Sequence, residues 1–153
     1  MSVFNGMNIT ATALTAQRLR MDVISSNLAN AQTTRGTLVN GEWRPYTRKT
    51  VVFQEQKNSN TFASHLKKAK SNTMTVAGAG VRVTRIEEDD DPYKLVYDPT
   101  HPDANEAGYV EMPNVDLLKE TVDYMSATRA YEANITALNA TKSILMKTME
   151  IGK

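Results

Sequence analysis

Apolar residues recur every seven positions at both ends of the chain, but not in its middle. The N-terminal series is Met7, Leu14, Met21 and Leu28, and the C-terminal series is Leu117, Tyr124, Tyr131, Leu138 and Leu145. Because seven residues make nearly two turns of an α-helix, each series forms one stripe along a helix. The pattern predicts a coiled-coil-like pair of long terminal helices. These stripes, with Met149, are the predicted subunit-interface residues.

The first predicted helix covers residues 7–31, and Asn5-Gly6 is expected to break the chain just before it. A second apolar line, Ile9, Ala13, Ala16 and Val23, runs beside the seven-spaced stripe. A helix with two partly apolar faces has more than one neighbour. Polar residues interrupt both faces, so we do not expect this helix to be stable alone.

The last predicted helix begins after Asn114, a good N-cap, with Asp116 and Glu120 near its positive end. It runs to about Glu150, and Gly152 suits the C-terminal cap. About 36 residues give a length of roughly 54 Å, about 18 Å more than the first helix. Its apolar overhang near the C-terminus is therefore expected to pack on neighbouring subunits.

Residues 32–113 are predicted to form a small β module inserted between helical segments 1–31 and 114–153, which makes the fold class α+β. The β-like runs are 37–39, 47–53, 81–86, 94–97 and 109–112. Asn40-Gly41 is a strong hairpin dipeptide. The polar stretch 55–77 predicts a mobile loop with one helical turn near Phe62–Leu66. Two prolines within Asp98–Pro102 predict a turn.

The overall charge favours neither nucleic acid nor an anionic membrane as a partner. There are 18 basic and 17 acidic side chains, a net charge of +1. Hydrophobic residues make up 41%, enough for a core. Cysteine is absent, which excludes disulfides and thiolate chemistry. We find neither a secretory signal nor a run of about 20 apolar residues that could span a membrane.

No residue set predicts catalysis, a metal site, a cofactor or a small-molecule substrate. His101 lies between Asp98 and Asp103, but the prolines there favour a turn over a metal site. The acidic run Glu87–Asp91 lacks the spaced oxygens of a calcium loop. Lys67-Lys68-Ala69-Lys70 has no interleaved aromatic residues and is more typical of a charged loop than of a nucleic-acid site.

The residues beside the two stripes carry a resemblance to a known family. Ser25-Ser26-Asn27-Leu28-Ala29-Asn30-Ala31-Gln32-Thr33-Thr34 resembles the N-terminal signature of the bacterial flagellar axial proteins, the rod and hook family. Arg129-Ala130-Tyr131-Glu132-Ala133-Asn134 resembles the C-terminal signature. Arg35 follows the threonines as in proximal rod proteins. Leu95–Asn105 with Gly108-Tyr109-Val110 narrows the resemblance to one proximal rod subunit. The family-motif residues are Ser26, Asn27, Leu28, Ala29, Asn30, Tyr131, Glu132, Ala133 and Asn134.

The resemblance implies a structural subunit of the flagellar basal body that is not an enzyme. Such subunits leave through the flagellar type III export channel and assemble outside the cytoplasmic membrane. Their terminal helices form a tube that surrounds the channel and transmits torque. The implied partners are copies of the chain, other rod proteins, and the membrane-ring and export-gate components at the rod base.

Two other classes of function stay open on the residues. A soluble helical adaptor or export chaperone would keep its helices paired with each other. An enzyme, such as a cell-wall hydrolase, would need a cleft with convergent acid groups in the β module, and no motif indicates one.

Overall fold

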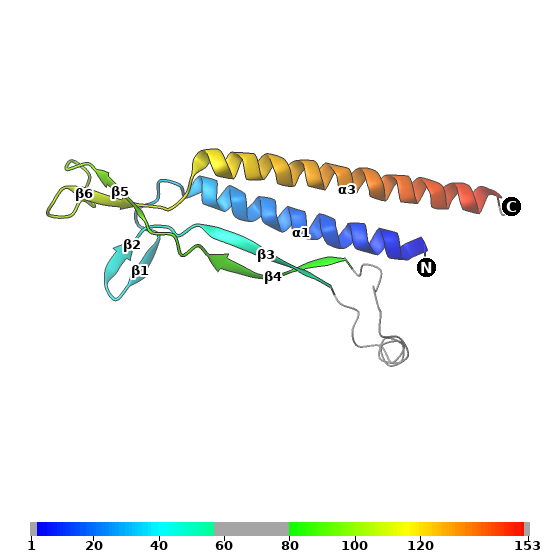
Figure 1. Ribbon diagram of the computed structural model, residues 1–153, viewed down its shortest axis with the longest axis horizontal. Coiled ribbons are helices and arrows are strands. Elements are labelled where there is room, and N and C mark those ends of the chain that lie inside the picture. Colours follow the sequence, from blue (N-terminus) through cyan, green and yellow to red (C-terminus); the bar gives the residue numbers. More distant parts are fainter. Residues whose placement is uncertain (1–2, 57–79, 152–153) are drawn as a thin grey trace, which may run out of the picture. The chain divides into compact units, whose positions relative to one another are not determined.

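The computed structural model describes residues 3–56 and 80–151. Its elements are α1 (Val3–Ala29), β1 (Thr37–Val39), β2 (Glu42–Arg44), β3 (Lys49–Glu55), β4 (Val81–Glu88), β5 (Lys94–Tyr97), β6 (Tyr109–Met112) and α3 (Leu117–Ile151) (Figure 1). Two long helices at the ends of the sequence and short strands between them confirm the predicted α+β class. The predicted helical turn near 62–66, most of the predicted loop 55–77 and the cap at Gly152 lie outside the described residues.

Helix α1 begins at Val3, so the predicted break at Asn5-Gly6 is wrong. A single glycine lowers helix stability by only about 1 kcal/mol, which the rest of the helix overrides. The hydroxyl of Thr10 also donates to the carbonyl oxygens of Gly6 and Met7, at 3.1 and 2.9 Å, across this stretch. The helix ends at Ala29, two residues before the predicted end.

Helix α3 is capped by Asp116 and not by the predicted Asn114. The Asp116 Oδ1 atom accepts a hydrogen bond of 3.0 Å from the backbone N–H of Leu118, near the start of the helix. Asn114 instead accepts a hydrogen bond of 2.8 Å from the backbone N–H of Arg48. With 35 residues against 27, α3 exceeds α1 by eight residues, or roughly 12 Å and not the predicted 18 Å.

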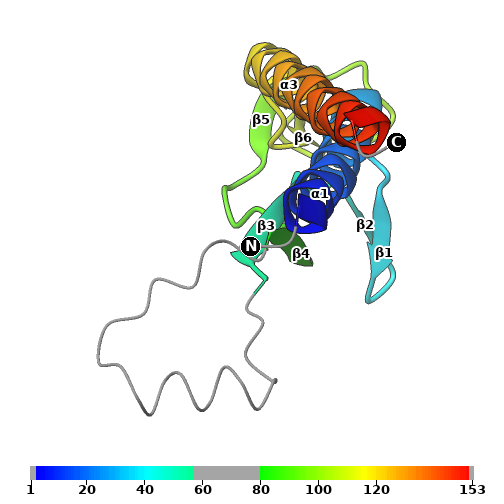
Figure 2. The same cartoon turned by 90° about the vertical axis from the view of Figure 1, so that its right-hand side faces the viewer.

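The Asn40-Gly41 hairpin is confirmed, and its second arm is β2, within residues 42–46 that follow the turn. Asn40 and Gly41 both have positive φ, 54° and 88°, as a type I′ turn requires. The predicted β-like run 47–53 corresponds to β3, which begins at Lys49, ends at Glu55 and pairs with β4. Strands β5 and β6 form a third two-stranded sheet, and Figure 2 shows it separate from β1–β2.

The chain divides into two compact units, and the second contains residues 19–52 and 85–128. Within it, the end of α1 lies beside the start of α3 in the opposite direction. Arg20 forms an ion pair of 3.2 Å with Asp123, and the Thr128 hydroxyl donates to the Met21 sulfur at 3.6 Å. The buried apolar side chains of this unit are Val23, Ile24, Val110, Val115 and Ala127.

The first unit contains residues 1–18, 53–84 and 129–153, apart from those outside the described ranges. Its buried apolar residue on α1 is Ala16. Gly80 has a φ of +95°, and the next residue, Val81, donates its N–H to the Thr12 hydroxyl at 3.2 Å. Along α3, one side is half-buried at alternating spacings of three and four: Tyr131, Asn134, Leu138, Thr141 and Leu145.

We predict that Gly80→Ala lowers the free energy of unfolding by about 1–3 kcal/mol. The new Cβ would combine a left-handed backbone with a clash against the Thr12 side chain. The matched control is Gly6→Ala, because that position is open and helical; it should be neutral or stabilise by roughly 0.5–1 kcal/mol. Urea unfolding followed by circular dichroism measures both. Equal stability of the two variants would contradict the described backbone at Gly80.

Candidate assembly interface

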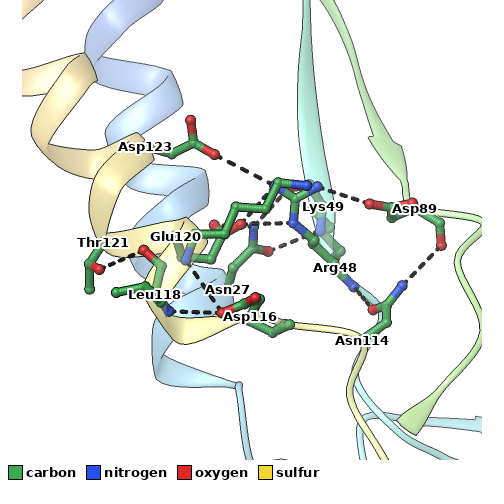
Figure 3. Close-up of polar contacts among 12 residues, drawn as sticks. Asn27, Arg48, Lys49, Asp89, Asn114, Asp116, Leu118, Glu120, Thr121 and Asp123 are labelled. Carbon is green, nitrogen blue, oxygen red and sulfur yellow. Dashed lines mark hydrogen bonds and ion pairs between the residues drawn. The ribbon is translucent and has the colours of Figure 1, made fainter.

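The amide of Asn27 links the end of α1 to a strand and to α3 within the second unit (Figure 3). Its Nδ2 donates to the Lys49 carbonyl oxygen at 2.8 Å and to Glu120 Oε2 at 3.0 Å. Its Oδ1 accepts from the Lys49 N–H at 2.9 Å and from the Tyr46 hydroxyl at 3.0 Å. Both donors and both acceptor positions of this buried amide are therefore satisfied.

Glu120 is 0% exposed, so its charge must be balanced inside the protein. Arg48 balances it: its Nε donates to Glu120 Oε1 at 2.7 Å. The same guanidinium donates to Asp89 Oδ2 at 2.9 Å and lies 3.9 Å from Asp123 Oδ2. Asn27, Arg48, Glu120 and Asp89 are called the polar network below. It joins α1 and α3 to the residue before β3 and the residue after β4 (Figure 3).

Hydrogen bonds and neighbouring charges favour the charged forms of Arg48 and Asp89. Burial lowers the pKa of Arg48, but hydrogen bonds to Asp89 and Glu120, with their charges, outweigh burial and leave that pKa raised. The hydrogen bond from Arg48 holds the pKa of Asp89 below its usual value. Removing one partner of a buried ion pair typically destabilises a protein by about 3–5 kcal/mol. The network therefore fixes how these elements are joined.

An apolar hollow of about 360 Å³ lies on the outside of the same helical pair. It is lined by Ser25, Leu28, Ala29 and Tyr124, from the end of α1 and the first turns of α3. Leu28 and Tyr124 both belong to the seven-spaced stripes, and the structure brings them together here. A partly exposed apolar hollow of this kind is typical of a surface that another protein covers.

The predicted subunit-interface residues fall into two groups by exposure. Leu28, Leu117, Tyr124 and Met149 are exposed. Met7, Leu14, Met21, Tyr131, Leu138 and Leu145 are half-buried. The seven-spaced stripe of α1 therefore lies beside the buried side of the helix. That buried side contains Ala16 and Val23, which belong to the second apolar line. The assignment of all ten residues to a subunit interface stays a prediction.

The family-motif residues also divide between buried and exposed positions. Asn27 is buried in the polar network, whereas Ser26, Leu28, Ala29, Glu132 and Ala133 are exposed and Asn30, Tyr131 and Asn134 are half-buried. The other two motif asparagines bond only to residues three or four positions away in the chain. Asn30 Nδ2 donates to the Ser26 carbonyl at 2.9 Å, and Asn134 Nδ2 donates to the Ala130 carbonyl at 2.8 Å.

The predicted proline turn is confirmed, and it is tied to the segment after α1. Asp98 Oδ1 accepts hydrogen bonds from the Thr100 hydroxyl at 2.7 Å and from its N–H at 3.1 Å. Asp103 Oδ1 accepts from Arg35 Nε at 2.7 Å, and its Oδ2 accepts from the Thr34 hydroxyl at 2.8 Å. His101 Nδ1 accepts the Asp103 N–H at 3.1 Å, so the imidazole serves the turn itself.

Residues 3–56 and 80–151 contain no group of three or more histidine, cysteine or acidic side chains placed to hold a metal ion. Neither of the two helices there has a stretch apolar enough to cross a membrane.

The roles of Arg48, Glu120 and Asn114 in the structure differ from those that the sequence pattern predicts. The pattern places Glu120 only near the positive end of α3, yet Glu120 lies seven residues before the fully buried Ala127. That spacing is the signal that could have placed Glu120 on the covered side of the helix. No local pattern identifies Arg48 as its partner, because the two residues are 72 positions apart.

We predict that Asn27→Ala destabilises the chain by about 3 kcal/mol or more, because it leaves several buried groups without hydrogen bonds. Asn30→Ala is the matched control from the same motif, and it should cost less than about 1 kcal/mol because its half-buried amide bonds only to Ser26 and Thr33 nearby in the chain. Urea unfolding of both variants measures the difference. A cost for Asn27→Ala no larger than for Asn30→Ala would contradict the role given to the network.

A second prediction concerns the stability of the chain at low pH. Hydrogen bonds from Arg35 and Thr34 hold the pKa of Asp103 below its ordinary value of 3.8. A depressed folded-state pKa contributes stability above pH 3.8 that is lost as the pH falls through the folded value. Asp103→Asn should therefore lower the urea midpoint at pH 7, and the gap to the natural chain should narrow below pH 4. The exposed Glu106→Gln is the control. A gap that stays constant between pH 7 and pH 3 would contradict this account.

Comparisons with known proteins match both helical ends and the whole chain. Residues 7–36 match the family model "Flagella basal body rod protein", and residues 106–151 match "Flagellar basal body rod FlgEFG protein C-terminal". The flagellar basal-body rod protein FlgC of Bacillus subtilis is 59% identical over 153 residues, all of both chains. FlgC of Borreliella burgdorferi is 43% identical over 99% of this chain and 98% of its own. FlgC of Salmonella typhimurium is 40% identical over all of both chains.

Sequence identity of 40–59% over the full length of the chain shows membership of one protein family, and not only a shared fold. The two family models cover the segments that carry the motif residues around Asn27 and Asn134. The chain belongs to the FlgC family of flagellar basal-body rod proteins.

Proposed function

We propose that the chain is a structural, non-enzymatic subunit of the proximal rod, which polymerises through its terminal helices into the tube that surrounds the export channel and transmits torque. The observation that carries this proposal is the apolar hollow formed by Leu28, Ala29 and Tyr124. It lies where the N-terminal family motif meets α3, and its apolar lining is open to another subunit.

In each unit, α3 exposes further large apolar side chains. On the first turns the exposed ones are Leu117, Leu118, Val122, Tyr124 and Met125, and on the last turns Ile144, Met146, Met149 and Ile151. Ile151 is 85% exposed and Met149 is 75% exposed. Apolar exposure on this scale marks an interaction surface. Helix α3 also carries the small residues Ala130, Ala133, Ala137 and Ala140, which permit close approach of a second helix.

The polar network suits a subunit that transmits torque. Because it joins α1 and α3 to the segments just before β3 and just after β4 through hydrogen bonds and ion pairs, the second unit resists rotation of one element against the others. In this proposal segments 1–31 and 114–153 form the assembly core, and 32–113 is the inserted module. The partners are copies of the chain, other rod proteins, and the ring and export-gate components at the rod base. After export, the subunit lies outside the cytoplasmic membrane.

We predict that Leu28→Asp and Tyr124→Asp each remove the chain from basal bodies and abolish swimming. A carboxylate buried in an apolar contact between subunits costs several kcal/mol, whereas both side chains are exposed in the isolated chain, so folding should persist. Thr121→Asp is the control, because it adds the same charge on the same helix outside the hollow. The measurements are swimming in soft agar and detection of the chain in purified basal bodies.

The same experiment separates the rod subunit from the helical adaptor or export chaperone. An adaptor would stay in the cytoplasm and would be absent from purified basal bodies even as the natural chain. Normal assembly of both hollow variants would show that this surface is not an interface between subunits.

A further inference from the structure

A polar pocket of about 310 Å³ lies in the second unit, between the β1–β2 hairpin, the proline turn and β6. Its lining includes Trp43, Tyr109, Asp103 and Glu111. The helices contribute no residue to it, so it is distinct from the apolar hollow described above.

The groups around this pocket differ in whether they already have partners. Asp103 is satisfied by Arg35 and Thr34. Within residues 3–56 and 80–151, the carboxylate of Glu111 and the indole N–H of Trp43 take part in no hydrogen bond or ion pair. The pocket therefore presents one carboxylate and one aromatic face that are open to a ligand.

Exposed apolar side chains surround the pocket on both hairpins. Leu38 lies directly opposite Trp43 in the β1–β2 register, and opposed residues project from the same face. Leu95 and Tyr97 are opposite Glu111 and Tyr109 in β5–β6 and share their face for the same reason. Trp43 is 55% exposed, and Leu95 and Tyr97 are each 65% exposed. We call Leu38, Trp43, Leu95, Tyr97, Tyr109 and Glu111 the hairpin surface.

The composition of the hairpin surface fits a protein partner better than a small polar ligand. Tryptophan and tyrosine are enriched among the residues that dominate binding energy between proteins, and they are surrounded there by apolar contacts that exclude water. Scattered single apolar residues need no explanation, but here five large ones gather around one pocket.

The negative charge of this region favours a partner with a cationic side chain. Residues 33–46 and 94–112, which form the two hairpins and the segments beside the pocket, contain five carboxylates against three cations, Arg35, Arg44 and Lys94, a net charge of −2 with His101 neutral. The whole chain is +1. A cationic side chain gains from the free Glu111 carboxylate and also from the face of Trp43. Its apolar stem can pack on Leu95 and Tyr97.

We propose that the hairpin surface is a second docking site, which receives an arginine or lysine side chain from a neighbouring rod subunit. The cation lies against Trp43 and pairs with Glu111, and aliphatic residues beside it cover Leu38, Leu95 and Tyr97. This proposal rests on the rod-subunit function and adds to it a contact made by the inserted β hairpins.

Cross-linking in assembled rods tests the proposal. The full chain carries the photoreactive residue p-benzoylphenylalanine in place of Trp43, as the only copy in a flagellated strain, and basal bodies are irradiated and analysed by mass spectrometry. The expected product joins position 43 to a peptide of a rod subunit within a few residues of an arginine or lysine. Cross-linking at cell-wall glycan, or at a peptide without a nearby cation, would overturn the proposal.

Charge variants in the same background test the role of Glu111. Glu111→Lys should reduce the cross-link yield about tenfold, and Glu111→Gln by a smaller factor, because a charge-assisted pair is lost and in the first case a repulsion is added. Glu42→Lys is the matched control: it makes the same charge change on the β1–β2 hairpin, beside position 43, but Glu42 pairs with Val39 on the other face. An unchanged yield with Glu111→Lys would overturn the proposal.

The outcome also distinguishes this proposal from the function on which it rests. If the natural chain is absent from basal bodies, the rod-subunit function itself fails. If the chain is present and position 43 gives no cross-link to a rod subunit, only the docking site fails. Urea midpoints of the variants, compared with that of the natural chain, show that the exposed substitutions leave folding intact.

Discussion

The buried carboxylate of Glu120 is the constraint on which the second unit depends. A carboxylate without access to water must be neutralised and given hydrogen bonds, or it destabilises the fold. Arg48 supplies the opposite charge and Asn27 supplies an amide donor. Glu120 lies in α3, Arg48 in the segment before β3, and Asn27 in α1. The ion pair and hydrogen bonds of this one carboxylate therefore join three segments that are distant in sequence.

Reliance on a polar network follows from how little apolar surface the chain buries. The buried hydrophobic side chains among the described residues are few and mostly small: Ala16, Val23, Ile24, Val110, Val115 and Ala127. Many of the larger apolar side chains, such as Leu118, Met125 and Met149, are exposed. Directional polar contacts therefore set the internal arrangement, and the apolar surface is left for contacts with other subunits.

The sequence predicted elements well where the signal was local. The strands near 81–86, 94–97 and 109–112, the Asn40-Gly41 turn and both long helices follow from alternation, turn chemistry and the seven-residue spacing. Two boundary signals failed because a stronger interaction overrode them. Asn5-Gly6 did not stop α1, and Asn114 did not cap α3, since its side chain is used by the Arg48 backbone and Asp116 takes the cap.

The candidate site was predictable only in part, for a physical reason. The stripe residues Leu28 and Tyr124 were identified from spacing, because helical periodicity is a property of neighbours in sequence. The partnership of Arg48 with Glu120 is a property of the folded chain, and nothing near either residue encodes it. Asn27 lies between these cases. Its place in the family motif indicates a functional or structural role, but the role itself, four hydrogen bonds of a buried amide, is visible only in the folded chain.

A buried ion pair also has consequences for how the subunit assembles. Replacing such a pair with apolar residues is often neutral or stabilising, so stability alone does not account for it. An apolar stripe tolerates sliding by one turn, whereas Glu120 can satisfy Arg48 and Asn27 in only one alignment of α1 with the start of α3. That alignment decides whether Leu28 and Tyr124 line one hollow. The polar network inside the unit thus determines the shape of the apolar surface that the unit presents to its neighbours.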